Sequence, residues 1–118
     1  MKNNNTILAQ KVPHGTQFIV NRKFRPSYIF KPGRTIKITI YKERIIGVYP
    51  VFLTDIMYFS AERHSIKKVI TAAKTENNIE ITVEHNSKQD VLADNLNISQ
   101  AQLIISELKK NLPKSVFK

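Results

Sequence analysis

A short segment near the amino end combines cations with aromatic rings in a way that suits contact with nucleic acid. Between positions 22 and 37, six Lys or Arg side chains and three aromatic side chains occur without a single acid. Cations neutralise phosphates and release counterions, and an exposed ring stacks on an unpaired base for ~1–3 kcal/mol. Arginine adds planar, bidentate contacts to phosphate. The predicted contacts are Arg22, Lys23, Phe24, Arg25, Tyr28, Lys31, Arg34 and Lys37.

The aromatic rings of this segment differ in how well they suit stacking. Phe24 has a charged residue on each side, which favours an exposed ring. Tyr28 and Phe30 alternate with Ile29, so burial in a small core and contact with a base are equal alternatives for them. Tyr41 shares a predicted strand face with Lys37, and it extends the same platform in this interpretation.

The charge is distributed very unevenly along the chain. The formal net charge is +10, and residues 1–42 hold nine Lys or Arg and no acid. Residues 43–118 hold ten Lys or Arg against nine Asp or Glu. One sign of charge concentrated in one segment indicates a surface that attracts a polyanion. Since no helix-turn-helix or zinc-finger pattern occurs, we expect single-stranded or loop regions of mRNA rather than duplex DNA.

Residues for catalysis or metal binding do not form a recognisable pattern. The three glycines are too few and too scattered for a phosphate-binding glycine loop, and no serine lies in a nucleophile elbow. His14, His64 and His85 are far apart, so we expect each on the surface and no zinc site. Glu80 and Glu84 share a strand face that we expect to meet solvent. The sequence therefore predicts no enzyme, no metal and no cofactor.

The bulk properties are those of an ordinary globular chain. The 118 residues predict one domain, 1–118, in which residues 1–6 are flexible. Cysteine is absent, which fits a reducing compartment, and no apolar stretch near the amino end resembles a secretory signal. No run approaches the ~20 apolar residues of a membrane-spanning helix. We expect a cytoplasmic protein.

Alternating apolar and polar residues predict several strands. Over residues 35–41 three isoleucines fall on one face, and Thr35, Lys37, Thr39 and Tyr41 fall on the other, polar face. Residues 53–60 suit a buried strand nearly as well as a short helix capped by Thr54 or Asp55, and Pro50 argues against a continuous central strand at its position. The other predicted strands cover residues 18–20, 28–30, 44–49, 66–73, 79–84 and 90–93.

One long helix is predicted near the carboxyl end. Ala101, Ile104, Ile105, Leu108 and Leu112 form an apolar stripe. Within residues 99–112, Ser99 and Gln102 have the spacing of a capping box, and Pro113 stops the helix. About six strands and one helix predict an α+β, mostly β fold. We expect a small curled antiparallel sheet or barrel with this helix packed on it.

The chain resembles the PrgU-like family of small regulators, which are encoded with surface-adhesin genes on enterococcal pheromone-responsive conjugative plasmids. The resemblance lies in the short basic chain, the cationic-aromatic segment 22–37, the β-rich middle and the closing helix 99–112. It implies a PUA-like RNA-binding fold. It also implies post-transcriptional regulation that lowers expression of an adhesin and conjugation operon. It supplies no binding residues that could be transferred to this sequence.

A different class of function fits the same pattern. Strands followed by a carboxyl-terminal helix also describe a pleckstrin-homology-like barrel, and residues 53–56 resemble a segment of bacterial members of that class. In that alternative, the basic segment binds anionic lipid or an acidic partner protein. A homodimer is a third hypothesis, which requires an exposed apolar patch.

Overall fold

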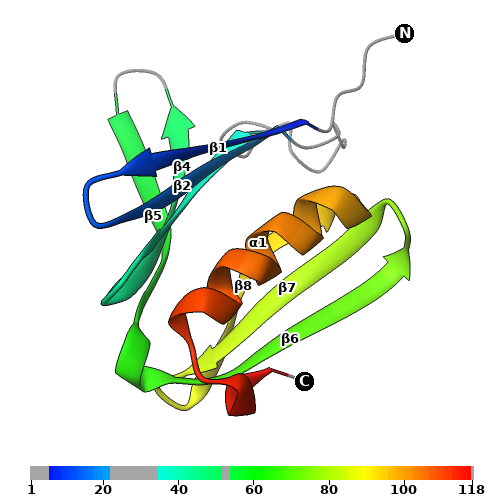
Figure 1. Cartoon of the computed structure of the whole chain (residues 1–118). Coiled ribbons are helices and arrows are strands. Elements are labelled where there is room, and N and C mark those ends of the chain that lie inside the picture. The colour runs from blue at the N-terminus through cyan, green and yellow to red at the C-terminus, as the bar shows by residue number, and fades with distance from the viewer. Residues whose placement is uncertain (1–5, 22–34, 52–53, 118) are drawn as a thin grey trace, which may run out of the picture.

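Two antiparallel β-sheets face each other, and a helix fills the open side between them (Figure 1). The computed structural model describes residues 6–21, 35–51 and 54–117. The first sheet has the strand order β1-β2-β3-β4-β5, so every neighbour in the sheet is also a neighbour in the chain. Its strands are β1 (Thr6–Val12), β2 (Gly15–Asn21), β3 (Thr35–Tyr41), β4 (Arg44–Val51) and β5 (Thr54–Glu62).

The second sheet is a three-stranded meander that continues directly from the first. A short 3-10 helix, η2 (Arg63–Ser65), joins the two sheets. The strands are β6 (Ile66–Thr75), β7 (Asn78–His85) and β8 (Lys88–Leu96), in that order. The helix α1 (Ile98–Asn111) follows, and a last 3-10 turn, η3 (Lys114–Val116), leads Phe117 into a parallel bridge with Val69 of β6.

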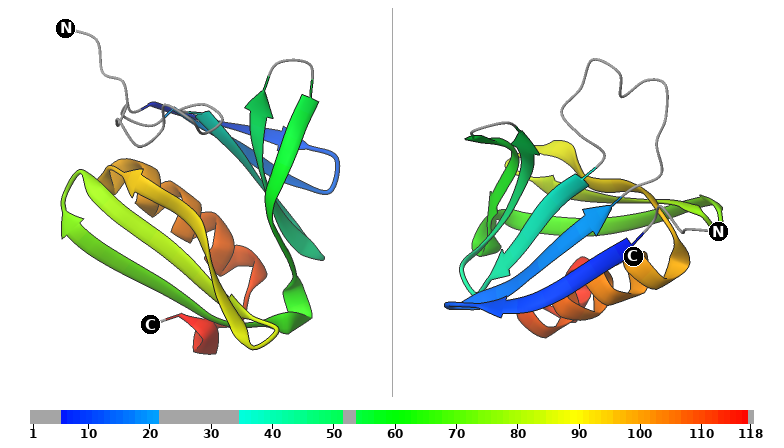
Figure 2. Two further views of the ribbon diagram at one scale, coloured as in Figure 1. Left: turned by 180° about the vertical axis from the view of Figure 1, so that it is seen from behind. Right: turned by 90° about the horizontal axis from the view of Figure 1, so that it is seen from above.

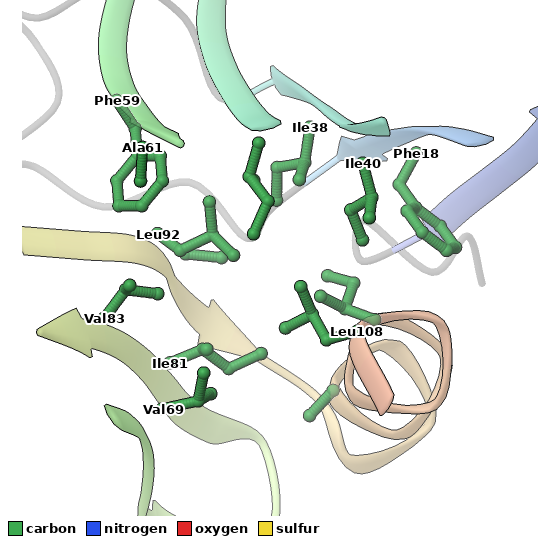
Figure 3. Packing of buried hydrophobic residues seen from close by; sticks show 14 of the residues in the cluster. Phe18, Ile38, Ile40, Phe59, Ala61, Val69, Ile81, Val83, Leu92 and Leu108 are labelled. Atoms are coloured by element: carbon green, nitrogen blue, oxygen red, sulfur yellow. The ribbon is translucent and has the colours of Figure 1, made fainter. Parts of the chain in front are cut away.

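A single apolar cluster connects both sheets and the helix. Figure 3 shows Phe18, Ile38 and Ile40 of the first sheet opposite Ile81 and Leu92 of the second, and α1 contributes Leu108. Burial of these side chains away from water is the main favourable term for the fold. The helix contacts β2, β7 and β8, so it closes the side of the core that the sheets leave open.

Strand β3 follows the predicted alternation, with one difference. Ile36, Ile38 and Ile40 are buried as expected. On the opposite face Thr39 is also buried, and it accepts a hydrogen bond of 3.3 Å from the Gln17 amide. Because β3 has strands on both sides, its outer face is partly covered by its neighbours. The predicted polar outer face is therefore only partly open to solvent.

The ambiguous segment around residue 56 is a strand. Thr54–Glu62 forms β5, paired with β4 as far as Val51 opposite Thr54. Pro50 lies near the end of β4, which continues to Val51. The ladder between β3 and β4 runs only from Ile45 to Val48 on β4, so at Pro50 the strand pairs with β5 alone and is not a central strand, as expected.

The helix begins two residues earlier than the predicted capping box requires. Asn97 is the N-cap; its side-chain oxygen accepts from the Gln100 backbone N–H at 2.8 Å. The Gln100 side chain in turn accepts from the Asn97 N–H at 2.9 Å. The proposed pair Ser99 and Gln102 is therefore wrong, although the kind of cap is right. The apolar stripe is confirmed, since Ala101, Ile104 and Leu108 are buried.

The expected fold class is confirmed: the chain is mostly β and antiparallel, with a carboxyl-terminal helix packed on the sheets. Over the described residues the two sheets stay separate, so they form an open pair rather than a closed barrel. Eight strands occur there instead of about six, and the additional strands include β1, whose first residue is Thr6. The predicted strand 28–30 lies outside the described residues. In the described part of the chain, no helix is long and apolar enough to cross a membrane.

Candidate nucleic-acid interface

The structure places one of the eight predicted contact residues. Lys37 lies on the outer face of β3, between Ile19 of β2 and Val48 of β4, and it is half-buried. A lysine in such a position packs its aliphatic stem on its neighbours while the ammonium reaches water. The other seven residues lie outside the described residues: Arg22, Lys23, Phe24, Arg25, Tyr28, Lys31 and Arg34.

An open pocket of about 850 Å³ lies where two hairpin turns of the first sheet meet the second half of α1. The lining residues come from the β1–β2 turn, the β3–β4 turn and α1, and Figure 2 shows the β1–β2 hairpin passing over the helix in the view from above. We call it the turn pocket. The residues that define it are Lys11, Gly15, Thr16, Tyr41, Lys42, Arg44, Glu107 and Asn111.

Backbone hydrogen bonds fix both turns that border the pocket. The β1–β2 turn is closed by Pro13 and His14, and His14 has a φ of 68°, the sign that the third position of a type II turn requires. The His14 carbonyl accepts from the Lys42 N–H at 3.3 Å, which joins the two turns. The Glu43 carbonyl accepts from the Arg63 N–H at 2.8 Å. The pocket rim is therefore held at several points.

Three cations surround the mouth of the pocket. Lys11, Lys42 and Arg44 are exposed, and none of them forms an ion pair with an acid that the structure describes. Glu43 lies between two of them in the chain and reduces the local excess. An exposed cation without a protein partner retains its full capacity to bind an anion. The pocket mouth is therefore suited to phosphate.

An acid, Glu107, forms the inner wall of the pocket. Its side chain is 14% exposed, and one carboxylate oxygen accepts a hydrogen bond of 3.1 Å from the Thr16 hydroxyl. The other oxygen lies 3.5 Å from the Lys110 ammonium. Asn111 lies one turn further along the helix, and its carbonyl accepts from Arg63 Nε at 2.6 Å. The helix end and the pocket wall are thus fixed together.

Tyr41 forms the aromatic part of the wall. Its cross-strand partner is Gly15, and a Cβ at that position would stand 3.1 Å from the Tyr41 ring and 2.6 Å from the Ile40 carbonyl oxygen. Only glycine therefore lets the ring lie against the β1–β2 turn. The ring is half-buried and lines the pocket beside Lys42 and Arg44.

The first sheet is slightly more positive than the second. The described residues of its five strands and their turns hold four cations and three acids, and the acids are Glu43 and, on β5, Asp55 and Glu62. Residues 66–96, which form the second sheet, hold four Lys and five Asp or Glu. Glu80 and Glu84 are half-buried on β7, and Asp90 contacts Lys88 and His85 on its own hairpin. The electrostatic field therefore favours a polyanion at the turn pocket over the second sheet.

The prediction for the histidines is wrong at one position. His14 and His64 are exposed, but His85 is buried at 2% exposure, with its Nε2 atom 2.9 Å from the Asp90 carboxylate. It lies at the end of β7, where the strand alternation turns its ring toward Phe59 in the core. In the part of the chain that the structure describes, no three His, Asp or Glu side chains gather as they would around a metal ion.

The pocket residues Arg44 and Glu107 were not among the predicted contacts. Lys11 and Lys42 belong to the acid-free first third, so both carried a signal in the sequence. Arg44 and Glu107 carried none, because the fold brings them to Lys11 from 33 and 96 positions away. No protein-family model, no curated protein and no solved structure matches the chain. The PrgU-like resemblance thus stays a prediction.

Proposed function

We propose that this chain is an RNA-binding regulatory protein that binds single-stranded or loop regions of mRNA and is not an enzyme. The observation that supports this most is the turn pocket: three exposed cations without acidic partners among the described residues, around a cavity of about 850 Å³. In this proposal Lys11, Lys42 and Arg44 contact phosphates. Lys37 extends the contact along the first sheet, as does the predicted segment 22–34.

The regulatory part of the proposal comes from the family resemblance. Protein bound to a message changes how ribosomes translate it or how nucleases degrade it. In this proposal, binding lowers expression of an adhesin and conjugation operon. Cross-linking in cells followed by sequencing of the recovered RNA tests this part. Recovery of adhesin messages supports it, and recovery of unrelated RNA with no enrichment contradicts it.

Salt dependence tests the RNA contact itself. The logarithm of affinity for a single strand falls with the logarithm of salt concentration, by ~0.7 for each phosphate contact. Replacing Lys11, Lys42 and Arg44 together by Ala should reduce this slope by about 2. A matched control replaces Lys67, Lys74 and Lys88 by Ala. These lysines are exposed on the second sheet, and their replacement removes the same amount of charge. Equal effects of the two triple variants would remove the turn pocket from the proposal.

A second candidate function, binding to anionic lipid, has one observation in its favour. Ile56 and Met57 on β5 are 46% and 57% exposed, and apolar side chains of this kind insert into membrane surfaces. They pair with Tyr49 and Val48 of β4, four or five residues from Arg44 of the turn pocket, or about 14–17 Å along the strand at ~3.4 Å per residue. The two sites can therefore be tested apart. Lipid binding predicts that Ile56→Ser with Met57→Ser abolishes co-sedimentation with anionic vesicles, whereas RNA binding predicts unchanged RNA affinity.

A further inference from the structure

Arg63 lies where the first sheet, η2 and the end of α1 meet. Its backbone N–H donates to the Glu43 carbonyl of the β3–β4 turn at 2.8 Å, and its side-chain Nε donates to the Asn111 carbonyl at 2.6 Å. Figure 1 shows η2, the green turn between β5 and β6, beside the carboxyl end of α1. Because Asn111 also lines the turn pocket, Arg63 connects the pocket to the helix end.

The Arg63 guanidinium is oriented in the free protein. Its bond to the Asn111 carbonyl uses one of its five N–H donors. The side chain is exposed, and it forms no ion pair with any acid that the structure describes. A donor group that is held in place before its ligand arrives loses less entropy on binding. A planar guanidinium in this situation is suited to a bidentate contact with phosphate.

Two lysines extend the cationic surface along the end of the helix. The Lys110 ammonium lies 3.5 Å from the Glu107 carboxylate in the pocket wall, and its side chain is 67% exposed. Lys114 is exposed in η3, three residues after Asn111, so the two Cα atoms lie no more than about 11 Å apart. We call Arg63, Lys110 and Lys114 the helix-end cluster.

The fold concentrates positive charge at this end of the molecule. Three acids, Glu43, Glu62 and Glu107, accompany the six cations of the turn pocket and the helix-end cluster. Glu62 lies 3.3 Å from the His64 ring, and Glu107 accepts from the Thr16 hydroxyl. Residues 43–118 are nearly neutral as a sequence, yet three of their cations gather here. Such an excess of one sign attracts a polyanion.

We propose that the helix-end cluster continues the RNA-binding surface beyond the turn pocket and contacts further phosphates of the same strand. Arg63 supplies a bidentate contact between the two, and Lys110 and Lys114 supply charge along the helix end. Contacts of this kind are made to the RNA backbone, so they add affinity without base preference. This inference rests on the proposed RNA-binding function and adds a second part of the protein to its binding surface.

The first test measures how salt weakens binding of the full chain to a fluorescently labelled uridine dodecamer. Lys110→Ala combined with Lys114→Ala should reduce the slope of log affinity against log salt concentration by about 1.4, or ~0.7 for each lost contact. Lys74→Glu removes the same net charge at the opposite end of β6 from η2, and it should leave the slope unchanged. A cytidine dodecamer should give the same difference. Equal slopes in the two variants would overturn the inference.

Arg63→Lys separates the guanidinium from its charge. This variant should bind the dodecamer about ten-fold more weakly, as expected for the loss of one charge-assisted hydrogen bond, with an unchanged salt slope. Ser65→Ala is the structural control, because it removes a hydrogen bond of 2.8 Å within η2, from the Ser65 hydroxyl to the Glu62 carbonyl, and no charge. Melting curves check that both variants fold. An equal loss of affinity in both would assign Arg63 to the shape of η2 alone and overturn its phosphate contact.

The outcomes distinguish this inference from the proposed function. If replacing the three turn-pocket cations lowers the salt slope and replacing the two helix-end lysines does not, RNA binding stays and the cluster has no part in it. Absence of binding by the unaltered chain at low salt overturns both. Co-sedimentation with anionic vesicles is measured in parallel. If the helix-end variant loses vesicle binding and keeps the RNA slope, the cluster binds lipid and the inference is overturned.

Discussion

The Thr16 hydroxyl on β2 donates a hydrogen bond of 3.1 Å to the Glu107 carboxylate on α1, 91 positions further along the chain. Thr16 is buried, and this bond ties the first sheet to the helix at the inner wall of the turn pocket. A strand from the amino end and a helix from the carboxyl end thus position one pocket. Its geometry depends on the tertiary fold.

Replacing Thr16 by Val should test this connection. Valine keeps the β-branched shape that the strand favours and removes the hydroxyl, so the change isolates the hydrogen bond. We expect the free energy of unfolding in urea to fall by about 1 kcal/mol. Thr71→Val, at an exposed position of β6, should change stability by less than ~0.5 kcal/mol. Identical effects of the two substitutions would show that the bond contributes nothing.

The position of the helix cap gives a second prediction. Asn97→Ala removes the acceptor for the Gln100 N–H and should destabilise the protein by ~0.5–2 kcal/mol. Ser99→Ala should have little effect, because Ser99 is exposed within the first turn of α1. Chemical denaturation of both variants measures the difference. A larger loss for Ser99→Ala would restore the capping box that the sequence suggested.

Strand β7 and the helix could be predicted because their burial is periodic. Residues 79–84 alternate between buried and half-buried along β7, and Ala101, Ile104 and Leu108 recur at helical spacing. The cap was misplaced by two residues because Asn97 and Ser99 both precede a glutamine by three positions. Such local patterns are ambiguous until the helix start is known.

The parts that could not be predicted depend on partial burial or on distant contacts. β1 has weak periodicity because it is an edge strand: Ala9, Gln10 and Lys11 are exposed, so no buried face marks it in the sequence. The turn pocket joins β1, β3 and α1, and no spacing in the sequence encodes that meeting. Of the eight contact residues predicted from composition, Lys37 is the one that lies within the described residues, and it is on the outer face of β3.

Gly47 on β4 should not tolerate a side chain. A Cβ there would stand 2.6 Å from Tyr58 Cζ. The Tyr58 ring cannot move aside freely, since its hydroxyl donates to the Leu92 carbonyl at 2.5 Å and its ring lies 4.8 Å from that of Tyr49. We expect Gly47→Ala to lower the free energy of unfolding by ~1–3 kcal/mol. Combined with Tyr58→Leu, the loss should be smaller than the sum of the two single losses, because the clash is gone. Strict additivity would contradict this contact.

The buried His85 gives the last prediction. Its Nδ1 atom has no hydrogen-bond partner among the described residues, so Asp90 supplies the one polar contact found for the ring. Asp90→Ala would leave both nitrogens unpaired in the core, and a buried polar group without a partner costs about 1–3 kcal/mol. Asp90→Asn keeps an oxygen that can accept from Nε2–H, so it should retain most of the stability. Gln89→Ala, at the exposed neighbouring position, is the matched control. Thermal and urea unfolding of the three variants should therefore rank Asp90→Ala as the least stable. If Asp90→Asn lost as much stability as Asp90→Ala, the charge of Asp90, and not its hydrogen bond, would hold His85 in place.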